Sequence, residues 1–237
     1  RIYKDAFGDI VRIGLPAGIQ GCIFSLSNVV IQSSINSFKD VAITANAEAS
    51  NIEGFVYTAM NAVSQACLTF TGQNYGARKR KNIDVTLFDS LIVVVLLGLV
   101  VGFGAYFAGS FLLSIYTKSP DVIRLGLERM SVICTTYCLC GIMEVLVGSM
   151  RGMGHSVVPM LMSIIGVCGV RIVYIYTFFA ANRTLFNLYL SYPISWAITI
   201  LAHAICLVFV RKREFKRLAA ALPVEPTDPP TAPAEAA

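Results

Sequence analysis

The chain alternates long, uncharged hydrophobic stretches with short polar segments. Ile13–Phe38, Ser90–Thr117 and Thr184–Val210 contain no Asp, Glu, Lys or Arg. Each is longer than the roughly 20 residues that an α-helix needs to cross a bilayer. Charged and turn-forming residues delimit six predicted spans, at about residues 11–38, 41–70, 87–116, 122–150, 157–180 and 185–210. A transmembrane β-barrel would instead show segments of about ten residues with alternating polarity. The pattern therefore predicts an all-α, polytopic membrane protein.

Composition supports the same fold class and separates the bundle from a tail. Only 14% of the residues are charged, 56% are hydrophobic, and the mean hydropathy is +0.68. Soluble domains average about a quarter charged residues, so this chain has too few charges to cover a water-facing surface. We assign residues 1–213 to a six-helix transmembrane bundle and residues 214–237 to a cytoplasmic tail rich in proline and alanine. Within that tail, Leu222–Ala237 is predicted to be disordered, because it has little apolar area to bury.

Lysine and arginine are distributed unevenly between the two sets of loops. Six spans put both chain ends on one side, and that side gathers thirteen Lys or Arg residues. The other side has three, Lys39, Lys118 and Arg183. Because the cytoplasmic loops of membrane proteins are the basic ones, we predict cytoplasmic termini and a location in the plasma membrane. The aromatic residues Tyr189, Tyr192 and Trp196 are predicted to lie in the outer interfacial belt.

Other functional classes find little support in the sequence. No basic patch with interleaved aromatic residues indicates a nucleic-acid partner. The two histidines, His155 and His203, lack metal-ligand spacing, and the chain has no G-x-S-x-G or G-x-x-x-x-G-K-[ST] motif. The seven cysteines lie inside apolar stretches without a C-x-x-C pair, as packing residues do. We therefore predict neither an enzyme nor a metal or organic cofactor.

Polar residues recur at helical spacing inside the predicted spans. One face of the span at 41–70 carries Asn46, Ser50, Glu53, Tyr57, Asn61 and Ser64. One face of the span at 122–150 carries Tyr137, Gly141, Glu144, Gly148 and Arg151. A charged side chain at mid-bilayer costs at least about 2.5–3.5 kcal/mol, so it normally faces a cavity or a partner. We therefore predict a shared, water-accessible cavity with the binding residues Glu53, Glu144, Tyr57, Asn61, Tyr137, Gln20, Asn28 and Arg171.

Two simpler interpretations of these polar residues stay open. The polar side chains could serve only as hydrogen-bonding contacts between helices. Alternatively, Arg171 and Glu144 could form an ion pair within the membrane. Three further charged residues are expected near span ends, where a long side chain reaches the polar interface: Glu48, Glu128 and Arg129.

Three motifs resemble those of one known family. Gly72-Gln73-Asn74-Tyr75-Gly76-Ala77-Arg78-Lys79 follows the polar-striped second span, and Gly148-Ser149-Met150-Arg151-Gly152-Met153-Gly154 ends the fourth. Gly14-Leu15-Pro16 opens the first span, where proline fits a first helical turn. In order and spacing, residues 1–213 resemble the second half of a multidrug and toxic compound extrusion (MATE) transporter. The resemblance implies a twelve-helix protein in two six-helix lobes, of which this chain is the C-terminal lobe, helices seven to twelve. The N-terminal lobe is then its partner.

The resemblance also implies a function. MATE proteins, many of them bacterial, export organic cations in exchange for protons or sodium ions, using acidic residues in the lobes. The NorM-like branch has carboxylates on helices seven and ten. Here the Phe24–Asn28 stretch has no acid, and Glu144 lies about a turn from the expected position on helix ten. The aspartate on which the DinF-like branch relies belongs to the other lobe. The coupling ion, H⁺ or Na⁺, therefore stays open.

A physical mechanism follows as a hypothesis. Deprotonated Glu53 or Glu144 would attract an organic cation in a low dielectric, and the rings of Tyr57 and Tyr137 would add cation–π contacts. Protonation from outside would remove the attraction and release the compound. Two rivals remain. A lipid-linked oligosaccharide flippase of the same superfamily would need a larger, strongly basic cavity. A non-transporting membrane scaffold would keep its phenotype when both glutamates become glutamine.

Overall fold

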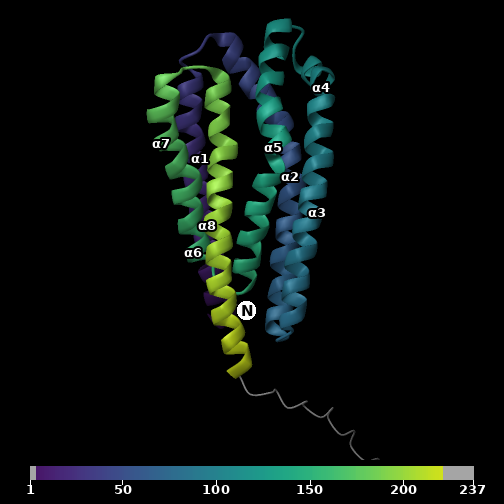
Figure 1. The fold of residues 1–237 in the computed structure, drawn as a ribbon, viewed down its shortest axis with the longest axis vertical. Helices are drawn as coiled ribbons and strands as arrows, with labels where there is room; N and C mark the ends of the chain where they lie inside the picture. The colour runs from purple at the N-terminus through teal and green to yellow at the C-terminus, as the bar shows by residue number, and fades with distance from the viewer. Residues whose placement is uncertain (1–3, 221–237) are drawn as a thin grey trace, which may run out of the picture.

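The computed structural model describes residues 4–220, without the side chains of residues 4–6 and 9, and its regular secondary structure over this range is entirely helical. The long helices run side by side along one axis (Figure 1). In chain order the elements are α1 (Lys4–Ile35), α2 (Asp40–Gly76), α3 (Arg80–Phe107), α4 (Gly109–Tyr116), α5 (Pro120–Gly152), α6 (Val157–Ser163), η1 (Ile164–Gly169), α7 (Val170–Tyr174), η2 (Ile175–Phe179) and α8 (Leu185–Ala220). The segments η1 and η2 are π-helical turns, so residues 157–180 form one continuous helical rod.

Five helical segments within residues 4–220 are long and apolar enough to cross a membrane. They are Ile10–Ile35, Arg80–Phe107, Pro120–Gly152, Val157–Phe179 and Leu185–Ala220. Helix α2, with 37 residues, is longer than each of these, but its polar stripe lowers its hydropathy. The protein is therefore an all-α, multi-pass membrane protein.

Three local expectations differ from the structure. Pro16 lies inside α1 and not in its first turn, a placement that membrane helices tolerate because neighbouring groups satisfy the freed carbonyl. The span predicted at 87–116 is interrupted at Ala108, between α3 and α4. Helix α8 continues to Ala220, so residues 214–220 of the predicted tail are helical. The disorder predicted for Leu222–Ala237 lies outside the described residues.

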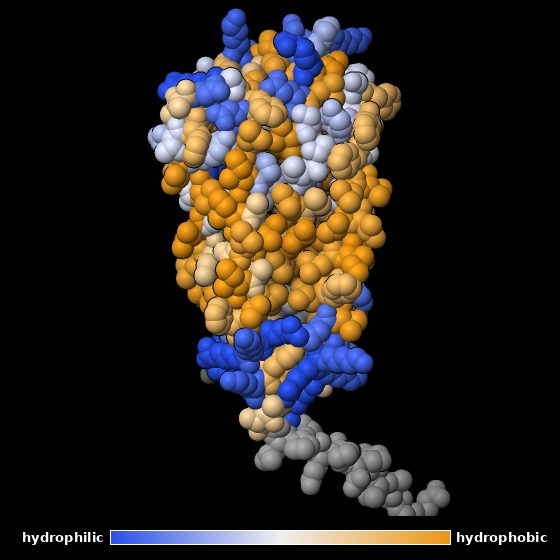
Figure 2. All heavy atoms as spheres, in the orientation of Figure 1, coloured by the Kyte–Doolittle hydropathy of each residue, from blue (hydrophilic) through white to orange (hydrophobic). Residues whose placement is uncertain are grey.

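The hydrophobic belt and the basic ends follow the predicted arrangement. Figure 2 shows an apolar band between two hydrophilic ends, as expected for a protein surrounded by lipid. The start of α1, the α2–α3 connection and the end of α8 lie at the same end of the bundle (Figure 1). The basic segments Arg78–Lys81 and Arg211–Arg213 thus share one end. That this end is cytoplasmic stays a prediction.

A polar cluster holds three segments together at this end. Glu214 of α8 is only 1% exposed. Its carboxylate accepts a hydrogen bond from the Tyr75 hydroxyl, lies 2.9 Å from His155 Nε2 and lies 3.0 Å from Arg217 Nη1. Tyr75 belongs to the end of α2, and His155 follows the Gly154 turn between α5 and α6. Because a buried carboxylate needs such partners, the cluster explains why α8 stays ordered beyond the apolar segment.

Helix α5 is the most buried of the candidate spans and packs against α2, α3 and α8. Glycines allow the close approach, as small residues do at membrane helix interfaces. A Cβ added at Gly102 of α3 would lie 2.3 Å from the carbonyl oxygen of Cys134, and one at Gly148 of α5 would lie 2.7 Å from that of Ser64. Both obstacles are backbone atoms, which cannot rotate away.

We predict that Gly102→Ala lowers the stability of the bundle by about 1–3 kcal/mol, because the added methyl group forces α3 away from α5. Gly104→Ala is the matched control, since a Cβ at Gly104 meets nothing within 4 Å. The measurement is thermal unfolding of the purified intact protein in detergent. Equal melting temperatures for the two variants would contradict this packing.

Candidate functional site

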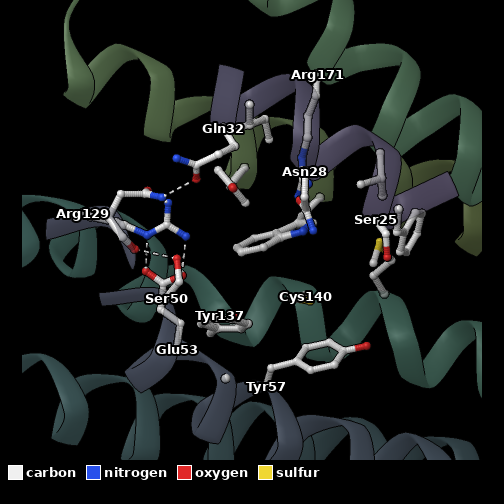
Figure 3. Close-up of a pocket in the computed structure, with 18 of the residues that line it drawn as sticks. Ser25, Asn28, Gln32, Ser50, Glu53, Tyr57, Arg129, Tyr137, Cys140 and Arg171 are labelled. Atoms are coloured by element: carbon white, nitrogen blue, oxygen red, sulfur yellow. Dashed lines mark hydrogen bonds and ion pairs between the residues drawn. The ribbon is translucent and has the colours of Figure 1, made fainter. Parts of the chain in front are cut away.

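A cavity of about 510 Å³ lies between α1, α2, α5, α7 and α8. Its volume is within the range of small-molecule sites. Apolar side chains such as Phe24 and Met143 form part of the wall, and polar or aromatic residues from every one of these helices line it. Figure 3 shows those of α1, α2, α5 and α7 around the cavity. The polar and aromatic lining residues are Ser25, Asn28, Gln32, Asn46, Ser50, Glu53, Tyr57, Arg129, Tyr137, Cys140, Glu144, Arg171, Tyr192 and Trp196.

The carboxylate of Glu53 is held by a buried arginine on the neighbouring helix. Arg129 of α5 donates from Nε to Glu53 Oε1 at 2.8 Å and from Nη2 to Oε2 at 2.6 Å (Figure 3). Its Nη1 donates to Asn46 Oδ1 on α2, and Asn46 Nδ2 donates to Gln32 Oε1 on α1 at 3.0 Å. Two parallel charge-assisted bonds of this kind fix both side chains. Glu53 is therefore neutralised and positioned before any ligand arrives.

Aromatic rings of α8 contact both cavity arginines. The guanidinium of Arg129 lies 5.4 Å from the Tyr189 ring centre and 5.5 Å from that of Tyr192. Arg171 lies over the same Tyr192 ring at 4.2 Å. These are cation–π distances, so the Tyr192 ring contacts two positive charges. The ring of Trp196 in turn packs on Tyr137 with the ring centres 5.4 Å apart.

Arg171 brings an uncompensated positive charge to the cavity. Its Nε donates to Ser195 Oγ at 3.1 Å, and it forms no salt bridge with an acidic side chain that the structure describes. The ion pair with Glu144 that the sequence left open is not formed. Arg171 is therefore a buried cation whose contacts are a hydroxyl group and aromatic rings.

Glu144 is the cavity carboxylate that stays available. It is buried on α5, and no hydrogen bond or salt bridge to its carboxylate occurs within the described part of the chain. Its backbone carbonyl accepts a hydrogen bond from Ser64 Oγ at 2.8 Å, which fastens this turn of α5 to α2. Arg151, two turns further along the same face, donates instead to Gln20 Oε1 at 2.8 Å. Glu144 therefore presents an anionic or protonatable group to the cavity.

The structure brings six of the eight predicted binding residues to this cavity. They are Asn28, Glu53, Tyr57, Tyr137, Glu144 and Arg171. Gln20 and Asn61 do not line it. Gln20 holds Arg151, and Asn61 Oδ1 accepts a hydrogen bond from Gln65 Nε2 on the same helix. Eight residues beyond Glu53, an α-helix has turned about 80° further, which removes Asn61 from the cavity face.

Two sequence expectations about neighbouring residues are wrong. Arg129 does not reach an interface at a span end, because it lies 4% exposed against Glu53. A signal was available, since Arg129 precedes Cys140, another lining residue, by eleven residues, which is about three helical turns and places both on one face of α5. Tyr189 and Trp196 are not in an interfacial belt; they are 0% and 4% exposed, packed against the cavity arginines or Tyr137.

We predict that Glu53→Gln destabilises the protein by about 3–5 kcal/mol, because it leaves the Arg129 guanidinium buried without a counter-charge. The double variant Glu53→Gln/Arg129→Gln should recover most of this loss. Glu48→Gln is the control on the same helix, since Glu48 forms no ion pair with a described residue. Thermal unfolding of the intact protein measures all four forms. A double variant as unstable as the single one would contradict the pairing.

Comparison with known proteins identifies the fold and the family. A family model described as MatE matches residues 16–177. The probable multidrug resistance protein YoeA of Bacillus subtilis (strain 168) is 20% identical over 202 residues, which are 85% of this chain and 44% of that protein. The structure of the Vibrio cholerae MATE transporter VcmN in the bent form matches with a TM-score of 0.80 and 17% identity, covering 90% of this chain and 48% of the other.

A third match carries a different description. A MOP superfamily transporter from Pyrococcus furiosus matches with a TM-score of 0.70 and 17% identity, over 93% of this chain and 47% of the other. Its binding pocket is described as having reverse polarity, suggesting a different function. The present chain thus spans a little under half the length of each of these three proteins. With the family model matching most of its length, this chain belongs to the MatE family of membrane transport proteins.

Proposed function

We propose that this chain forms one lobe of a secondary active transporter that exports organic cations in exchange for protons or sodium ions. The observation that carries the proposal is the Glu144 carboxylate, which has no ion-pair partner among the described side chains and lines a cavity of about 510 Å³ inside the bundle. Several relatives are named probable multidrug resistance proteins, which agrees with this activity. The expected location is a bacterial plasma membrane with both chain ends in the cytoplasm, in accordance with the basic residues at that end.

The two glutamates have different roles in this mechanism. An incoming cation would have to displace the Arg129 guanidinium from Glu53, which two short hydrogen bonds oppose. Glu144 has no such competitor among the described residues, so it is the group that attracts the cation. Tyr57, whose side chain lines the cavity and is 38% exposed, offers a ring face beside it. Tyr137 is already packed on Trp196 and contributes mainly to the wall.

Competition for one carboxylate is sufficient to couple the two transport processes. When a proton or sodium ion from outside neutralises Glu144, the Coulomb attraction that is strong in a low dielectric disappears. The cation then leaves to the outside, and the ion is released inwards after the lobes rearrange. A second six-helix lobe would close the cavity, and rocking of the two lobes would alternate its access. Such a partner lobe accords with the finding that this chain spans under half of the length of these relatives.

Arg171 favours a second candidate, the translocation of a lipid-linked, phosphate-bearing oligosaccharide. An arginine without an acidic partner suits a phosphate group, and two arginines line this cavity where the sequence predicted one. The Pyrococcus furiosus structure, described with a pocket of reverse polarity, supports considering this class. However, Glu53 neutralises Arg129, and Glu144 balances Arg171 in net charge. The cavity is therefore not strongly basic, and cation export remains the better-supported function.

We predict that Glu144→Gln reduces ion-driven cation transport at least about tenfold, since removing one charge contact in a low dielectric exceeds 1.4 kcal/mol. The intact protein in everted vesicles, supplied with a fluorescent organic cation and a proton or sodium gradient, measures this. Glu48→Gln is the matched control, because Glu48 does not line the cavity. Undiminished transport by Glu144→Gln would reject the proposed role, and no cation movement under either gradient in the wild type would favour the flippase or a scaffold.

Arg171→Gln separates cation export from flipping. An exporter should keep or increase its cation transport when this positive charge is removed, because the charge repels the substrate. A flippase should instead lose the translocation of a fluorescent phosphate-bearing lipid in proteoliposomes. Both assays are run on vesicles with equal amounts of folded protein. Loss of cation transport with normal folding would contradict the exporter model as stated.

A further inference from the structure

A second cavity lies at the surface between α6 and α8, apart from the central one. It measures about 520 Å³ and is lined by Val158 and Met162 of α6 and by a row of α8 residues, Ala202, Ile205, Cys206, Phe209 and Val210. We call this cavity the α6–α8 groove. Several of its apolar side chains are exposed, including Phe209 at 67%. The α8 residues recur every three or four positions, so they form one helix face.

The groove is apolar along its length and basic at one end. His155 and Arg213 line that end. From Ala202 to Arg213 the helix rises about 16 Å, which is roughly half of the hydrocarbon thickness of a bilayer. The basic end coincides with the hydrophilic end of the molecule that holds the end of α8, below the apolar band in Figure 2. A ligand that fits this shape has a long apolar part and a charged head at the interface.

A small recess beside His155 adds further polar groups to this end. It measures about 110 Å³ and is lined by Arg12 of α1 together with Gly154, His155 and Ser156. The Ser156 side chain is 3% exposed, and its Oγ has no hydrogen-bond partner in the described part of the chain. A buried hydroxyl without a partner costs free energy unless a ligand or water satisfies it. The recess and the basic end of the groove are adjacent, because His155 and Val158 line both of them.

Two arginines at this end have no acidic partner among the side chains that the structure describes. Neither Arg12 nor Arg213 forms an ion pair with a side chain that the structure describes. The nearby Glu214 carboxylate is already engaged by Tyr75, His155 and Arg217. The two arginines therefore keep their capacity to bind an anion, and arginine binds phosphate oxygens in a bidentate manner.

We propose that the α6–α8 groove binds one anionic phospholipid of the surrounding leaflet. Its acyl chain lies along Met162, Ala202 and Ile205, and its phosphate lies between Arg12 and Arg213, with Ser156 Oγ donating to a phosphate oxygen. Two arginines favour a lipid of net negative charge over a zwitterionic one, because a choline group would meet the same positive field. This lipid fastens α1, the α5–α6 connection and α8 together at the basic end.

Native mass spectrometry of the intact protein in detergent tests the site. Phosphatidylglycerol and phosphatidylcholine are titrated separately, and the first lipid bound is counted. We expect the wild type to retain one phosphatidylglycerol, and Arg12→Gln/Arg213→Gln to bind it about tenfold more weakly. Lys79→Gln/Lys81→Gln removes the same charge from the same end without touching the groove and should bind like the wild type. Equal affinity for both lipids, or equal loss in both double variants, overturns the proposal.

The apolar part of the groove is tested by a pair of neighbouring residues. Ala202→Trp fills the groove and should abolish retention of phosphatidylglycerol. Leu201→Trp adds the same ring at an exposed position of α8 that does not line the groove, and should leave retention unchanged. These two tryptophan variants test whether the groove holds a lipid even if Arg12→Gln/Arg213→Gln fails to fold. Retention unaffected by Ala202→Trp, or a wild-type dimer that excludes the lipid, shows that the groove holds no phospholipid.

Discussion

The ion pair between Glu53 and Arg129 determines how the helices around the cavity are arranged. Two buried charges are stable only if each pairs with the other, since either one alone carries a large desolvation cost. The pair joins α2 to α5, and Arg129 extends the connection to Asn46 and, through it, to Gln32 of α1. The same guanidinium contacts Tyr189 and Tyr192 of α8. One arginine thus connects its own helix α5 to α2, α8 and, through Asn46, α1, which together are four of the five helices around the cavity.

This constraint divides the charged residues of the cavity into fixed and available groups. Glu53 and Arg129 are fixed, and their charges cancel. Glu144 and Arg171 are available, because neither forms a salt bridge with a side chain that the structure describes. A ligand therefore meets one carboxylate and one guanidinium on opposite helices of a cavity whose frame is already set. The sign of the favoured substrate depends on which of these two groups it contacts, and a proton or sodium ion that binds Glu144 changes that balance.

The sequence was sufficient for features that depend on local periodicity. Apolar stretches gave the helices, and the three- and four-residue spacing brought Glu53, Tyr57, Tyr137 and Glu144 to one cavity. The sequence was insufficient where the position of a side chain depends on how two helices are aligned along their axes. The sequence analysis expected Arg129 near an interface. Its true position opposite Glu53 depends on the packing of α5 against α2, which the sequence of either helix alone does not show. Tyr192 and Trp196 resembled belt residues, and only the position of the arginines on α5 and α7 explains why they face inwards.

Equilibrium binding of a fluorescent organic cation to the purified intact protein tests the central claim most directly, namely that Glu144 is the available carboxylate and Glu53 is not. Binding is measured across a pH series and a sodium series, for the wild type, Glu144→Gln and Glu53→Gln/Arg129→Gln. If Glu144 is the available carboxylate, acid or sodium weakens binding to the wild type and to the double variant, while Glu144→Gln binds weakly and responds to neither ion. Binding to Glu144→Gln with wild-type affinity and wild-type ion dependence would contradict this claim.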